Sequence, residues 1–172
     1  MKNIVSTNKI EVKDTNIAVT VNEKNSWIES IIENLSQEFK SVNIVTNNIK
    51  LFKKLEETLF EEKGMAITVT NNKRKSLLKA DIILNIDFPE EVLNKYIIYD
   101  NSIIITLEEK VKIHKKRFNG KIISDYSICL EPNSQIFNNL NKYKYKNFDI
   151  KDLTECYIIN APDEIDNIII CN

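Results

Sequence analysis

Residues 16–39 read NIAVTVNEKNSWIESIIENLSQEF, and this stretch decides the fold. Residues 17–21 are a short apolar run rich in β-branched side chains, which is typical of a buried strand. Residues 22–25 are polar and predict a turn. Ser26 then opens a helix, because it has capping-box spacing to Glu29 and because apolar residues recur after it at helical spacing. The stretch therefore predicts a strand–turn–helix unit.

The same plan repeats along the chain. Further apolar strands are expected at residues 42–46, 65–69, 81–86 and 102–107. A strongly amphipathic helix is expected over residues 49–63, with Gly64 as its left-handed C-cap. Shorter helices are expected from Asn71 or Asn72 through Lys79, and from Pro89 through about Tyr96. Alternating strands and helices predict a parallel sheet covered on both faces, with the first strand near its centre. The fold class is a three-layer Rossmann-like α/β domain.

The rhythm changes in the last third of the chain. We expect residues 1–109 to form the Rossmann-like core, and residues 110–172 to form a C-terminal extension packed on the same domain. Asn119-Gly120 is a strong hairpin signal, so this extension is expected to contain a hairpin there and a helix over residues 149–159. Residues 168–171 are expected to form a last strand or a helix end.

The composition is that of an ordinary globular protein, with 42% hydrophobic and 28% charged residues and a formal net charge of -1. This balance argues against a protein that coats nucleic acid or a membrane surface. The 3 cysteines include no CxxC pair, so neither a disulfide framework nor a metal site is expected. The start of the chain lacks the apolar core of a signal peptide, and no apolar run reaches the ~18 residues of a membrane span. We expect a cytoplasmic protein.

Two segments carry a family resemblance. Residues 45–64, VTNNIKLFKKLEETLFEEKG, resemble a strand end, a polar turn and a long helix, and residues 77–91, LLKADIILNIDFPEE, contain an Ala-Asp pair followed by an apolar strand. Together they resemble the Rossmann NAD(P)-binding domain of the shikimate dehydrogenase and glutamyl-tRNA reductase group. The resemblance covers residues 17–107 and implies a parallel α/β fold and a dinucleotide site.

The sequence differs from that group at the positions that bind the cofactor and catalyse the reaction. The glycine-rich phosphate loop is replaced by the polar residues 22–26, and Trp27 is expected to be buried or partly buried at the edge of the crevice, where a pyrophosphate needs room. Asn47–Asn48 stand where the group has the arginine for a 2′-phosphate. The catalytic Lys and Asp of the group's substrate domain have no counterpart, so we expect no hydride transfer.

The candidate binding residues follow the carboxyl ends of the expected strands, which line the usual ligand crevice of an open α/β sheet. They are polar and mostly uncharged, which suits a ribose or a small polar metabolite: Asn22, Asn25, Ser26, Thr46, Asn47, Asn48, Asn85 and Asp87. Asp87 has a competing role as the cap of the helix that starts at Pro89. No catalytic residue is assigned.

Three functions stay open. The first is a degenerate, non-catalytic Rossmann-like protein that binds a protein partner, a second copy of itself or a small polar metabolite, without a cofactor. The second is an oxidoreductase that uses NAD or NADP through an atypical loop. The third is a phosphate- or RNA-binding accessory protein that acts through the basic residues 110–121. We expect this basic run, which includes the one histidine, His114, to be a solvated hairpin, and this argues against nucleic acid; no membrane partner is expected.

Overall fold

The computed structural model describes residues 14–107, 111–124, 127–130 and 168–171. The chain divides into two compact units, Met1–Ser124 and Asp125–Asn172. In the second unit β7 (Ser127–Leu130) pairs antiparallel with β8 (Ile168–Cys171), so the last expected element is a strand. The helix expected over residues 149–159 lies outside the described residues.

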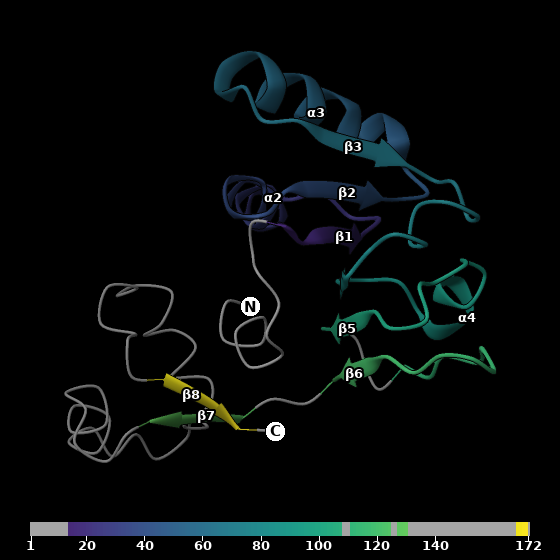
Figure 1. Ribbon diagram of the computed structural model, residues 1–172. Helices are drawn as coiled ribbons and strands as arrows, with labels where there is room; N and C mark the ends of the chain where they lie inside the picture. The colour runs from purple at the N-terminus through teal and green to yellow at the C-terminus, as the bar shows by residue number, and fades with distance from the viewer. Residues whose placement is uncertain (1–13, 108–110, 125–126, 131–167, 172) are drawn as a thin grey trace, which may run out of the picture. The chain divides into compact units, whose positions relative to one another are not determined.

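The first unit is built on a six-stranded sheet, and Figure 1 labels its strands except β4. In spatial order they are β3 (Ile67–Thr70), β2 (Ser41–Val45), β1 (Asn16–Thr20), β4 (Ile82–Asn85), β5 (Ile103–Thr106) and β6 (Lys121–Ile123). Every neighbouring pair is parallel. The five strands expected from the sequence are therefore confirmed, and β1 lies inside the sheet between β2 and β4.

One face of the sheet is covered by α2 (Ser26–Glu38) and α3 (Ile49–Lys63). Both helices bury one apolar stripe against alternate strand residues, and the buried helix side chains are Ile28, Ile32, Leu35, Phe52, Leu55 and Leu59. Gly64 ends α3 with φ of 65°, the left-handed C-cap that the sequence predicts.

The other face is covered by three connections that contain only one short helix in their described part, α4 (Glu90–Leu93). The helix expected through Lys79 is wrong, because residues 73–79 form turns. Asn72 caps this segment as expected, because its Oδ1 accepts from the backbone N–H groups of Arg74 and Lys75. The helical ladder does not continue, because the Lys73 carbonyl accepts from the N–H of Ile97 and the Leu77 carbonyl accepts from the N–H of Tyr99.

Two expectations at the start of α2 are also wrong. The N-cap is Asn25 and not Ser26, because Asn25 Oδ1 accepts from the N–H of Ile28 at 2.9 Å. Trp27 is 50% exposed. Ile28 is the first residue of the helix that points toward the sheet. Because successive residues of an α-helix are about 100° apart around its axis, Trp27 does not point toward the sheet.

The hairpin at Asn119-Gly120 is wrong as well, because residues 121–123 form β6, which runs parallel to β5. Gly120 does not adopt the positive φ of a tight hairpin turn; in the described residues only Gly64 does. Gly120 is required for space instead, since a Cβ atom there would lie 2.0 Å from the Ser102 carbonyl oxygen. That carbonyl accepts from the N–H of Lys121 at 3.2 Å.

The edge of the sheet at β3 is partly covered by α3. Glu56 of this helix places Oε1 3.3 Å from the backbone N–H of Val69, and its Oε2 pairs with Lys53 at 2.5 Å. A side chain of the helix layer therefore satisfies a backbone donor of the outermost strand.

The two glycines give a matched pair of substitutions. Gly120→Ala should lower the free energy of unfolding by about 3 kcal/mol or more, because the new methyl group meets a backbone carbonyl that cannot rotate away. Gly64→Ala meets no atom within 4 Å and should cost only the ~1–2 kcal/mol of a left-handed residue. Urea denaturation measures both, and an equal loss would contradict the space argument.

Candidate functional site

The sheet has a switch point between β1 and β4. From β1 the chain continues through α2 to β2 on one side, whereas from β4 it continues through α4 to β5 on the other side. Ligands of open α/β sheets bind at such a point, outside the carboxyl ends of the two strands. Residues 21–25 and 86–89 border this point, as the sequence predicts.

Asp87 bridges the switch point. Its carboxylate accepts from the backbone N–H of Asn22, at 2.8 Å to Oδ1 and 2.7 Å to Oδ2, and from the backbone N–H of Glu23 at 2.8 Å. These donors belong to the turn that, in dinucleotide-binding folds, receives the pyrophosphate. The turn thus already holds an anionic group supplied by the chain itself, and Asp87 does not cap α4, whose N-cap is Pro89 without a side-chain bond.

The turn after β1 is also tied to the turn after β2. Asn22 Oδ1 accepts from the N–H of Asn47 at 2.9 Å, and the Asn22 carbonyl accepts from the Asn48 side-chain amide at 3.1 Å. Three of the predicted site residues therefore come together in one network. The side chains that take part are those of Asn22 and Asn48, whereas Asn47 contributes its backbone N–H.

Two more predicted residues are wholly buried. Thr46 Oγ1 accepts from the N–H of Asn48 at 3.0 Å. Asn85 accepts from the Thr20 hydroxyl at 2.6 Å and from the N–H of Phe88 at 3.2 Å, and its amide donates to the Phe88 carbonyl and to Thr106 Oγ1. Both side chains shape the strand ends and present no free group to a ligand.

The N-terminus of α2 is likewise engaged. Asn25 caps the N–H of Ile28, and the carbonyl of Ser26 accepts from the Ser30 hydroxyl at 3.0 Å. Lys24 pairs with Glu29 at 2.9 Å. A phosphate group would have to displace Asn25 from the N–H of Ile28 and to separate Lys24 from Glu29.

An open hollow of about 360 Å³ lies beside this network, lined by Asn47, Asn48, Ile49, Lys50 and Leu51. It lies at the start of α3, after the β2 strand end. Asp87 and the turn residues that it contacts are not part of the lining of this hollow.

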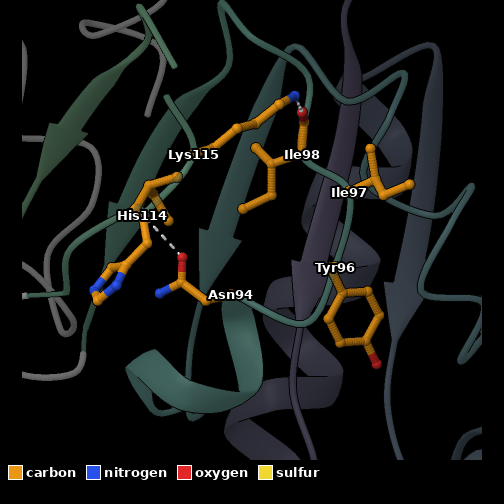
Figure 2. A pocket seen from close by; sticks show the side chains of 7 residues that line it. Asn94, Tyr96, Ile97, Ile98, His114 and Lys115 are labelled. Atoms are coloured by element: carbon orange, nitrogen blue, oxygen red, sulfur yellow. Dashed lines mark hydrogen bonds between the residues drawn. The ribbon is translucent and has the colours of Figure 1, made fainter. Parts of the chain in front are cut away.

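A second hollow of about 280 Å³ lies in the layer of connections, and Figure 2 shows its walls. Asn94 clamps one wall, because its amide donates to the Lys112 carbonyl and its Oδ1 accepts from the N–H of His114. Glu90 accepts from the N–H of Lys112 and lies 2.7 Å from His114 Nε2. The backbone bond from Lys112, followed by the contact with His114, holds the pKa of Glu90 below its ordinary value.

Tyr96 lines the same hollow but points away from His114 and Lys115 (Figure 2). The residue is 5% exposed, its ring packs against Phe88 at 5.7 Å between centroids, and its hydroxyl has no hydrogen-bond partner within the described part of the chain. Burial raises the pKa of Tyr96 above its ordinary value.

The sequence did not single out Glu90 or Asn94. They contact Lys112 and His114 across 18 to 24 residues, a separation at which neither residue has a local signal. Among the described residues, no group of three or more His, Cys, Asp or Glu is placed to hold a metal ion.

Comparisons with known proteins leave the family open. No protein-family model matches the chain, and no curated protein matches it in sequence. The structure supports the Rossmann-like fold, and membership of the shikimate dehydrogenase group has no support beyond that fold. No helix in the part of the chain described above has both the length and the apolar character that crossing a membrane requires.

Replacing Asp87 tests its contacts with the turn. Asp87→Ala should lower the free energy of unfolding by about 1.5–3 kcal/mol, because backbone donors lose a charged acceptor. Asp87→Asn should be destabilising too, since its amide turns an N–H toward other N–H groups. Glu91→Ala, an exposed acid four residues on, should change stability by less than about 0.5 kcal/mol. Urea denaturation measures all three, and an Asp87→Ala loss as small as the Glu91→Ala loss would contradict this assignment.

Tyr96→Phe removes a buried hydroxyl that has no partner. It should leave the protein equally stable or stabilise it by up to about 1–3 kcal/mol near neutral pH, because the desolvation of the hydroxyl is relieved. Because the pKa of Tyr96 is raised in the folded protein, the wild type keeps its full stability below about pH 10, the pKa of an unfolded tyrosine. Its free energy of unfolding falls as the pH rises from there through the folded pKa. Urea midpoints between pH 7 and 11 should therefore fall less for Tyr96→Phe, and parallel curves would contradict the burial argument.

Proposed function

We propose that this chain is a non-catalytic Rossmann-like binding domain, whose strand-end crevice contacts a protein partner or a small polar metabolite and is closed to dinucleotides. The single observation that carries the proposal is the Asp87 carboxylate on the N–H groups of Asn22 and Glu23. An internal carboxylate at the pyrophosphate position repels the phosphates and occupies their donors.

The anchors of the rest of a dinucleotide are also engaged elsewhere. Asn47 and Asn48, at the end of β2, bind Asn22. Hydride transfer needs a nicotinamide held against its substrate beside a proton donor or acceptor. Among the predicted site residues, Asp87 is the one with a titratable side chain, and it is committed to the backbone.

A small polar metabolite would lie in the hollow of about 360 Å³ beside Asn47 and Asn48. Lys50 lines this hollow from the first turn of α3, whereas Lys54 lies one turn further along the same helix. The hollow contains no catalytic pair, so the expected outcome there is binding and not turnover.

A ligand panel tests the proposal. NAD, NADP, their reduced forms, S-adenosylmethionine and ATP should leave the melting temperature unchanged, whereas a true ligand at 100 times its Kd would stabilise the folded state by about 2.7 kcal/mol. NADH or NADPH with keto acids and aldehydes should show no loss of absorbance. Turnover that is abolished by Asp87→Ala would overturn the proposal and favour an NAD(P)-dependent oxidoreductase.

A metabolite library then tests the binding site. A molecule that binds in the hollow should raise the melting temperature of the wild type and of Lys54→Ala, and should raise that of Lys50→Ala less. Equal shifts in all three proteins would place the ligand elsewhere.

A further inference from the structure

The two layers of the first unit carry opposite charge. The connections that cover the second face, residues 71–80, 86–102 and 111–120, are called the basic layer here. They contain nine lysines and arginines and four acids, whereas α2 and α3 on the other face contain four lysines and seven acids. The formal net charge of -1 for the whole chain conceals this separation.

Most acidic side chains of the basic layer already have a hydrogen-bond or ion-pair partner. Asp87 is bound to the turn after β1, Glu90 to His114, and Asp100 to Lys115 at 2.5 Å. Apart from Lys115, the lysines and arginines of the layer are exposed and form no ion pair within the described residues. The layer therefore presents an excess of uncompensated positive charge.

Hydrogen bonds bring the three connections side by side. The N–H of Ile97 donates to the Lys73 carbonyl at 2.8 Å, and that of Tyr99 donates to the Leu77 carbonyl at 3.2 Å. On the other side, Lys115 Nζ donates to the Ile98 carbonyl at 2.5 Å. Residues 95–100 thus form a strip between two basic segments.

This strip exposes apolar surface between the charges. Tyr99 is 39% exposed and Ile97 is 43% exposed, while Ile98 between them is buried. The hollow of about 280 Å³ adjoins the strip, with isoleucine side chains on its walls and His114 and Lys115 at one side (Figure 2). Its apolar walls and polar border suit a planar group with polar edges.

We propose that the basic layer binds single-stranded nucleic acid. Phosphates contact the cations of residues 73–75 and 116–117, and bases stack on Tyr99 and enter the adjoining hollow. Proteins that bind single strands combine a basic track with aromatic stacking platforms in this way. A concave hollow and a single exposed ring fit separate bases better than they fit the flat surface of an anionic membrane.

In the sequence, few aromatic residues lie within the basic residues 110–121, and this argues against nucleic-acid binding by that segment alone. The fold changes the argument, since it places residues 111–117 beside a strip that carries Tyr99 and beside the cations that begin at Lys73. The inference is independent of the proposed function, because it uses none of the candidate residues at the switch point.

Fluorescence anisotropy with a labelled 20-nucleotide oligouridine tests the proposal. Binding should be measurable at 50 mM salt and fall at 200 mM, because phosphate contacts release counterions. Lys116→Glu with Arg117→Glu should weaken binding and lower the slope of log K against log salt by about 1.4, at ~0.7 per phosphate contact. Lys40→Glu with Lys54→Glu, the same charge change at exposed residues outside the basic layer, should leave both values near those of the wild type.

Tyr99→Ala tests the stacking contact and should weaken binding about fivefold or more. Phe60→Ala is the control, because Phe60 is an exposed aromatic residue on α3, at 64%. Equal losses in the two charge variants, or no binding at 50 mM salt, would overturn the proposal. Binding to phosphatidylserine vesicles without binding to oligouridine would replace it by a membrane contact.

Discussion

The attachment of β4 to β1 is the constraint on which the rest of the structure depends. Three polar side chains of the β4 segment reach residues 64 or 65 positions earlier in the chain. Asp81 accepts from the backbone and side chain of Asn16, Asn85 accepts from Thr20, and Asp87 accepts from Asn22 and Glu23. These bonds hold both ends of β1 and the turn that follows it, so the register of the central strand pair is set by polar contacts as well as by apolar burial.

This attachment also decides what the switch point can do. In a dinucleotide-binding domain the turn after the first strand keeps its donors free for phosphate. Here the Asp87 carboxylate, which helps to fix the register of β1 and β4, accepts from the N–H groups of that turn. The same N–H groups cannot both stabilise the central strand pair and bind a phosphate at this turn. In this chain they stabilise the strand pair.

The sequence predicts those parts of the fold that depend on local patterns. The strand positions follow from apolar runs, and the end of α3 follows from Gly64. The errors lie where distant contacts decide: Gly120 is fitted to the Ser102 carbonyl, and the Lys73 carbonyl accepts from the N–H of Ile97 instead of continuing a helix. Asn22, Asn47 and Asn48 lie together at the strand ends. The partner of Asp87 lies 65 residues away, and no local signal shows which donors a carboxylate will reach.

The contact between Glu56 and Val69 has a consequence for self-association. An outer strand with unpaired backbone donors is a template on which another chain can extend a sheet. At β3 one such donor already has a carboxylate acceptor, and Lys53 holds that carboxylate in place. A strand from another molecule would have to displace a charged side chain to pair at that position. The α3 helix therefore protects this edge against edge-to-edge aggregation.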